Sequence, residues 1–245
     1  MRNRRTLIVG LTSLLYFAPA ANASHAWESF HWSRAANPLR LEVVDSVVGE
    51  WDALLTASVA DWDRSTVLAL SSSSGADSLV DRILCRPIGG KIRVCNAHYP
   101  DPTWLGLATV WLKGGHVAQA TAQVNDTWFD TVYADANAKR HVLCQEIGHG
   151  FGLDHTYTEP TCMDDTGGLS DPAYVSPGPH DYHQLEAVYA HLDGAGGAKA
   201  RKNRGRAPRG QDVCPANACR SMVRVWKDGP FTVVQYVLLP GVRVI

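Results

Sequence analysis

The sequence has almost no excess of charge of either sign. It contains 23 Lys and Arg residues against 24 Asp and Glu residues, which gives a formal net charge of −1. Nucleic acid attracts proteins mainly through basic surfaces, so a nearly neutral chain gives no electrostatic reason to bind it. We therefore expect no nucleic-acid partner.

Beyond its N-terminus the sequence lacks any run of about 18 apolar residues, the length that a membrane-spanning helix needs. At the N-terminus, Arg2, Arg4 and Arg5 precede an apolar stretch, Leu7 to Phe17, and the small residues Ala21-Asn22-Ala23. This order predicts a signal peptide over residues 1–23 and a secreted, extracellular protein with no membrane contact after cleavage. An N-terminal membrane anchor is the alternative, and the short apolar stretch argues against it.

The sequence also lacks C-x-x-C spacing, which disfavours a zinc cluster built from cysteines. Its six cysteines form an even set, and an exported chain favours disulfides over free thiols. Proximity in the sequence predicts the pairs Cys85–Cys95, Cys144–Cys162 and Cys214–Cys219.

Apolar periodicity predicts an α+β fold with helices packed on a single sheet. Strands are expected at 39–44, 66–70, 91–94, 105–112 and 116–124, with a loop at 71–75 and an unstructured lead at 24–37. Helices are expected at 51–62, from an N-cap at Asp135 through the motif described below, and at 180–192. Trp51 and Trp62 lie on the apolar face of the first helix and should belong to the core.

The last fifty residues differ in composition from the rest. Residues 194–213 contain six Lys and Arg residues and almost nothing apolar, which predicts a flexible linker or a processing site. A polyanion-binding patch is the less favoured alternative. Residues 214–245 are expected to form a small β-hairpin extension around Lys227-Asp228-Gly229-Pro230. The main domain is therefore placed at 24–193.

The segment HVLCQEIGHGFGLDH, residues 141–155, carries the chemistry. In a helix, residues 145 and 149 differ by about 40° around the axis and about 6 Å along it, so both side chains can reach one ion. Glu146 is close enough in angle to reach a water on that ion. His155 can join only if the helix stops, and Gly152, preceded by Gly150, lets the chain turn back.

These residues resemble the metzincin metallopeptidases, and within them the matrixin-like group. The resemblance rests on Glu146, His149, Gly152 and His155, on Met163, which is similar to the methionine of the family's Met-turn, and on Asp181, Leu185 and Tyr189, which are similar to the start of its C-terminal helix. It covers roughly residues 39–193. It implies a twisted mixed β-sheet with an active-site helix, a Met-turn and a C-terminal helix.

The resemblance also implies a function. We expect a monomeric, zinc-dependent endopeptidase in which Gln145, His149 and His155 bind Zn²⁺ and Glu146 is the general base. The substrate would be a peptide or protein, bound as an extended strand along the edge of the sheet, for which His116 to Asn125 is the candidate.

Gln145 stands where the family has its first zinc-ligand histidine. A carboxamide oxygen is a poorer zinc ligand than an imidazole, although its reach is similar. Other candidates for the third ligand remain open: His116, His180, His183, Asp154, Asp164 and Asp181. His141 lies about 12 Å along the helix from His149, which is too far for one ion.

Two hypotheses follow. One is the zinc endopeptidase; the other is a metzincin-fold module without catalysis that binds a peptide or protein in the same cleft. Glu146 favours the enzyme, because a scaffold has no need for a carboxylate beside the metal position. A Cys144–Cys162 disulfide would hold the metal-binding helix to the Met-turn in either case.

Overall fold

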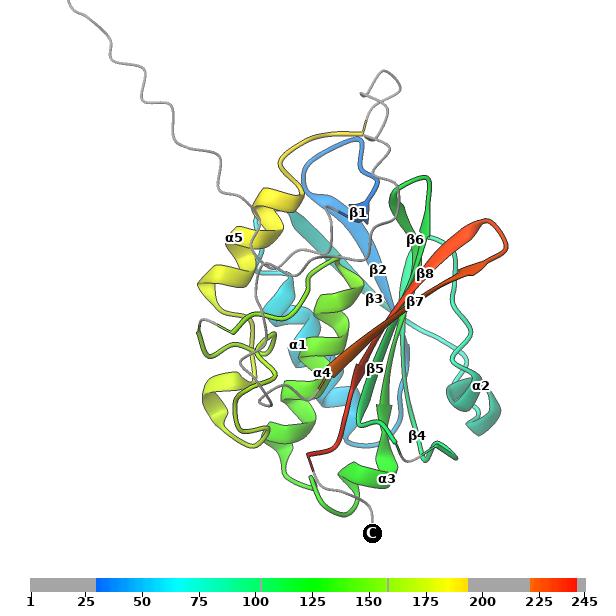
Figure 1. Ribbon diagram of the computed structural model, residues 1–245, viewed down its shortest axis with the longest axis vertical. Coiled ribbons are helices and arrows are strands. Elements are labelled where there is room, and N and C mark those ends of the chain that lie inside the picture. The colour runs from blue at the N-terminus through cyan, green and yellow to red at the C-terminus, as the bar shows by residue number, and fades with distance from the viewer. Residues whose placement is uncertain (1–29, 102, 158, 194–220, 242–245) are drawn as a thin grey trace, which may run out of the picture.

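The computed structural model describes residues 30–101, 103–157, 159–193 and 221–241. Its strands form one mixed, twisted sheet in the order β3-β2-β4-β6-β5-β8-β7, with β1 paired to β6 (Figure 1). The strands are β1 (His31–Trp32), β2 (Leu39–Ser46), β3 (Leu68–Ser74), β4 (Lys91–Ala97), β5 (Gly106–Lys113), β6 (His116–Asn125), β7 (Ser221–Asp228) and β8 (Phe231–Leu238).

The sheet has a parallel half and an antiparallel half. β2 pairs in parallel with β3 and β4, and β6 pairs in parallel with β4 and β1. β5 then runs antiparallel to β6, β8 antiparallel to β5, and β7 antiparallel to β8. The predicted β5–β6 hairpin is confirmed, and both glycines of its turn, Gly114 and Gly115, have positive φ.

Helices cover the sheet mainly on one side. They are α1 (Trp51–Trp62), α2 (Leu79–Leu84), α3 (Asp126–Phe129), α4 (Ala136–Gly150) and α5 (Pro179–Val188), with a 3₁₀ turn at Pro172–Tyr174. Figure 1 shows α1, α4 and α5 on one side of the sheet and α2 on the other. The predicted core tryptophans are confirmed: Trp51 and Trp62 are buried, and the Trp62 indole donates to the carbonyl of Cys144 at 3.1 Å.

Two local predictions were wrong. Residues from Phe30 onward are not an unstructured lead, because His31 and Trp32 form β1 and both are buried. Ser71 to Ser74 are not a loop but the end of β3, where they pair with β2. Pairing with a neighbouring strand overrode local composition in both places, and sequence periodicity does not report such pairing.

Other elements differ in extent. α5 ends at Val188 rather than at Leu192, and α2 and α3 were not predicted. The C-terminal hairpin is confirmed, with Gly229 at positive φ in its turn. It is not a separate appendage, because β8 extends the main sheet through its pairing with β5.

Two of the predicted disulfides are present, Cys85–Cys95 and Cys144–Cys162. The predicted Cys214–Cys219 bridge, the signal peptide at 1–23 and the linker at 194–213 lie outside the described residues. None of the helices in the described ranges has the length and apolar content that crossing a bilayer requires.

Candidate metal centre

The helix that carries the motif begins and ends as the sequence predicts. The Asp135 side chain accepts a hydrogen bond from the Ala138 N–H at 3.0 Å, which caps the first turn of α4. After Gly150 the chain turns at Gly152, whose φ is +97°. A Cβ on Gly152 would lie 2.2 Å from the carbonyl oxygen of Phe30. Glycine is therefore required both by the backbone angle and by the close approach of the chain that enters β1.

This turn brings His155 back against His149. Their Nε2 atoms lie 3.2 Å apart, and both side chains are almost fully buried. Two nitrogens bound to one tetrahedral zinc at about 2.0–2.1 Å would lie about 3.3 Å apart. The two rings are therefore placed as a pair of ligands to one ion.

The protonation of the rings supports the same interpretation. His149 Nδ1 lies 2.9 Å from the carbonyl oxygen of Leu153, which can only accept, so Nδ1 carries the proton and Nε2 presents a lone pair. His155 Nδ1 lies 3.5 Å from a carboxylate oxygen of Asp154. His149 Nε2 therefore presents its lone pair to His155 Nε2, and the space between them suits a proton carried by His155 or a metal ion.

Gln145 and Glu146 precede His149 on the same helix. Both side chains are buried, and among the described residues neither the Gln145 amide nor the Glu146 carboxylate has a hydrogen-bonding partner. Buried polar groups are rarely left unsatisfied, so these atoms indicate a missing ligand. Burial raises the pKa of Glu146 well above its ordinary value, and a divalent cation nearby would oppose that shift. The paired imidazoles of His149 and His155 therefore fit a metal ion, and Gln145 and Glu146 lie on the same helix as His149.

Met163, the expected Met-turn methionine, packs against α4 at Gly148. It is fully buried, and its Sδ would be 2.4 Å from a Cβ placed on Gly148, so the helix rests directly on the thioether. The Thr156 N–H donates to the Met163 carbonyl at 3.0 Å. The Cys144–Cys162 bridge adds a covalent link between the helix and this loop. The floor of the site is therefore rigid.

The other candidates for a third ligand have other neighbours. His180 and Asp181 begin α5, where Asp181 accepts from the Gly178 N–H at 2.7 Å. His183 is exposed on that helix. Asp164 accepts from the Thr166 N–H at 2.8 Å.

Two further candidates lie beside other histidines. His116 belongs to a separate histidine cluster, and Asp154 lies beside His155. Gln145 lies one helical turn before His149 on the same helix, and among the described residues its amide has no hydrogen-bonding partner, so we keep it as the third-ligand candidate.

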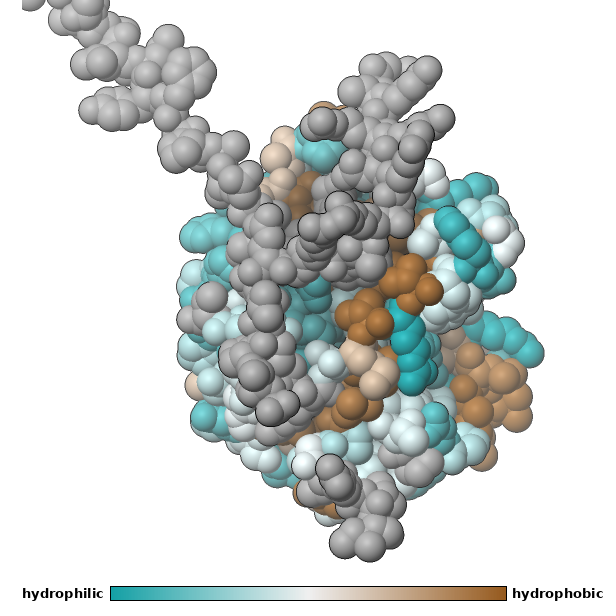
Figure 2. All heavy atoms as spheres, viewed as in Figure 1, coloured by the Kyte–Doolittle hydropathy of each residue, from teal (hydrophilic) through white to brown (hydrophobic). Residues whose placement is uncertain are grey.

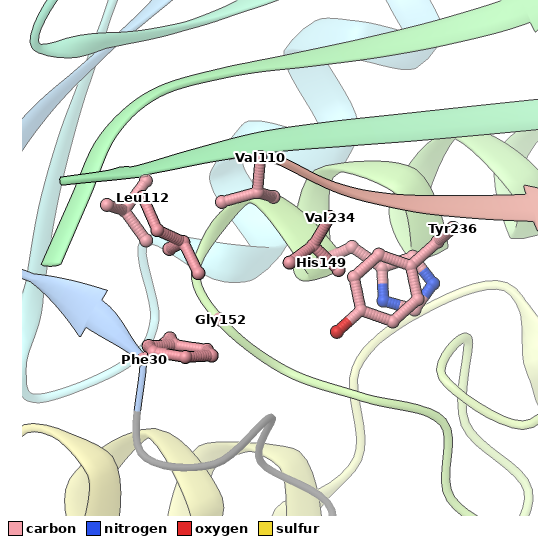
Figure 3. Close-up of a pocket in the computed structure, with 8 residues that line it drawn as sticks. Phe30, Val110, Leu112, His149, Gly152, Val234 and Tyr236 are labelled. Carbon is pink, nitrogen blue, oxygen red and sulfur yellow. The ribbon is translucent and has the colours of Figure 1, made fainter. Parts of the chain in front are cut away.

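The sequence did not reveal that the C-terminal hairpin reaches the site. The Tyr236 ring stacks on His149 with centroids 3.9 Å apart and an interplanar angle of 3°. Figure 3 shows the two rings lying face to face beside a small pocket lined by Val110, Leu112 and Val234 among others. At the start of β7, the Ser221 hydroxyl lies 3.4 Å from His155 Nδ1 and donates to Asp165.

The expected substrate edge was wrong. His116–Asn125, strand β6, lies inside the sheet between β4 and β5, so its backbone groups are already paired. The next strand of the sheet, β5, borders the site. Strand β8 pairs with β5 from Gly106 to Leu112, so the backbone groups of β5 are also paired. The alternation of apolar residues in β5 and β6 is similar, so their order in the sheet could not be determined from sequence.

No protein-family model and no curated protein matches this chain.

Proposed function

We propose that the chain is a secreted zinc-dependent endopeptidase with a metzincin-like fold. The observation that carries the proposal is the 3.2 Å separation of His149 Nε2 and His155 Nε2, which is close to the spacing of two ligands on one zinc ion. Parallel strands followed by an antiparallel β5, a helix ending in a glycine turn, and Met163 below that helix support the fold assignment.

Gln145, His149 and His155 would hold the zinc. When bound, zinc polarises the scissile carbonyl and lowers the pKa of water to about 7. Glu146 accepts a proton from the attacking water while the water oxygen bonds to the carbonyl carbon. Glu146 then delivers that proton to the amide nitrogen as the C–N bond breaks, which leaves a carboxylic acid and an amine.

The test combines zinc analysis of the purified full chain with cleavage of a fluorogenic peptide library. Glu146→Gln should retain zinc but lower the cleavage rate by about 10²–10⁴-fold, the usual contribution of a general base. Glu186→Gln, on the exposed face of α5, is the matched control and should not change the rate. A zinc-free protein, or one whose cleavage survives Glu146→Gln, would rule out this mechanism.

A second function is favoured by one observation. The site is almost sealed: His149 is 1% exposed, His155 4% and Glu146 1%. A metzincin-fold module without catalysis would have no need of solvent access at these atoms. Under that alternative, zinc would bind while no peptide in the library is cleaved by any variant.

A further inference from the structure

A second group of metal-ligating side chains lies apart from the candidate centre. His31 in β1, His116 in β6 and Asp193 after α5 bring their ligand atoms within 4.8 Å of one another, and His191 lies beside Asp193. The Asp193 carboxylate lies 3.4 Å from His31 Nε2, 3.9 Å from His116 Nε2 and 3.4 Å from His191 Nε2. The His31 ring centroid is 4.9 Å from that of His116 and 4.8 Å from that of His191.

The fold holds these residues in place by pairing. His31 and His116 are direct neighbours in the register of β1 with β6. On the other side, the Asp193 N–H donates to the Arg34 carbonyl at 2.7 Å, and the Arg34 N–H donates to Asp193 Oδ2 at 3.0 Å. The Arg34 Nε–H also donates to the His191 carbonyl at 3.1 Å. The backbone of all three segments is therefore fixed around the carboxylate.

One carboxylate is neutralised by one cation, so charge pairing alone does not explain three imidazoles around Asp193. Three neutral imidazoles and one carboxylate are the donor set that zinc and similar divalent transition metals prefer. The ligand atoms of His31, His116 and Asp193 lie within 4.8 Å of one another, and His191 Nε2 lies 3.4 Å from Asp193 Oδ1. The hydrogen bond from Arg34 orients the carboxylate, as outer contacts do in metal sites.

We propose that His31, His116, His191 and Asp193 bind one divalent transition-metal ion, with zinc as the best fit. Four protein ligands fill a tetrahedral coordination sphere, so this site is structural and leaves no position for a substrate. It fastens β1 and the segment after α5 to β6. His191 is on the outside, with its side chain 57% exposed, and provides the route by which the ion enters.

The test uses the full chain carrying His149→Ala and His155→Ala, so that the candidate catalytic centre contributes no binding. This protein is stripped with a chelator and titrated with Co²⁺ and with Zn²⁺. We expect one ion per chain, visible Co²⁺ absorption of tetrahedral type, and a rise in the unfolding temperature with Zn²⁺.

Further variants in the same background locate the ion. His191→Ala should weaken binding by at least about 100-fold, because it removes a direct ligand rather than an outer contact. Asp193→Asn, which keeps an acceptor for Arg34, should also weaken binding. His183→Ala, an exposed histidine on α5, is the matched control. Absence of binding in the background protein, or binding that neither His191→Ala nor Asp193→Asn changes, would overturn the site.

A separate observation concerns access to the candidate catalytic centre. β8 pairs with β5 from Gly106↔Leu238 to Leu112↔Thr232, and its Tyr236 covers the face of His149. Without β8, β5 would be the edge of the sheet, which is where an extended peptide can add as a strand. β8 is largely buried, whereas β7 is exposed along most of its length. Figure 2 shows hydrophobic side chains gathered along this hairpin.

We infer that the β7–β8 hairpin is an autoinhibitory cover that must leave β5 before a peptide can reach His149. This inference rests on the proposed function. Tyr236→Ala should raise peptide cleavage by about tenfold or more and should also speed the transfer of zinc from the protein to a chelator. Trp226→Ala, on the exposed strand of the same hairpin, is the control and should change neither rate.

A cross-link tests the cover without removing a core side chain. Thr109 and Gln235 are direct partners in the β5–β8 register, and their facing positions allow a disulfide between substituted cysteines. Thr109→Cys with Gln235→Cys should suppress both cleavage and zinc release once oxidised. If these variants alter zinc release but no form of the protein cleaves peptides, the proposed peptidase function is contradicted, whereas the covering role of the β7–β8 hairpin is supported. Unaltered zinc release and cleavage in both the Tyr236 and the cross-linked variants would overturn the cover.

Discussion

Gly106 in β5 faces the carboxylate of Glu146 in α4, and a Cβ at position 106 would lie 2.2 Å from Glu146 Oε1. The same Cβ would lie 2.6 Å from Val142 Cγ1, so the carboxylate has little room to move aside. The glycine therefore makes the space that the proposed general base occupies.

Gly106→Ala should lower peptide cleavage by about tenfold or more, because a displacement of about 1 Å at a reacting group can cost about 10²-fold. Zinc content should stay the same, since the ligands lie elsewhere. Gly89→Ala is the matched control, because a Cβ at Gly89 meets no atom within 4 Å. Equal steady-state rates for the two variants would show that Glu146 does not need this position.

Gln145→His should raise zinc affinity by about tenfold or more, equivalent to about 1.4 kcal/mol, because imidazole is the better zinc ligand. Competition with a chromophoric chelator measures this directly. Gln119→His, on the partly exposed part of β6, adds a histidine away from the site and should leave the dissociation constant unchanged. If the two variants behave alike, Gln145 is not a ligand.

Replacing both Cys144 and Cys162 with alanine should destabilise the protein by about 3 kcal/mol, the loop-closure estimate for a separation of 18 residues. The bridge joins α4 to the Met163 loop, so zinc affinity should also fall. Replacing Cys85 and Cys95 instead, at a separation of 10, should cost less and leave zinc affinity intact. Thermal unfolding and zinc titration of both double variants measure these effects. A larger loss of stability or of zinc affinity in the Cys85 and Cys95 variant would contradict the prediction.

Burial raises the pKa of Asp181 to about 6, against an ordinary value of 3.8. The folded protein therefore holds this proton more tightly than the unfolded chain. Asp181 contributes stability at pH below about 4 that is lost as pH rises to about 6, up to about 3 kcal/mol. Asp181→Asn should remove this contribution to the change of the free energy of unfolding with pH. Urea unfolding of both proteins at several pH values gives the free energy of unfolding as a function of pH. The same pH dependence in both proteins would refute the assignment of this effect to Asp181.

The sequence by itself determined the local machinery. The Asp135 cap, the helical spacing of Gln145 and His149, and the turn at Gly152 follow from short-range geometry, and the structure has each of them. The Cys144–Cys162 pair and the β5–β6 hairpin are also local in sequence and were predicted correctly. These features need only a few neighbouring residues, so patterns in the sequence can indicate them.

Only the tertiary structure decided which distant segments meet. β8 pairs with β5 across more than a hundred residues, which places Tyr236 on His149 and makes β5 an inner strand. The pairing of β1 with β6 and the contact of Arg34 with Asp193 assemble the second histidine cluster. No periodicity encodes such partners, because strand order depends on packing and backbone pairing between segments far apart in the chain.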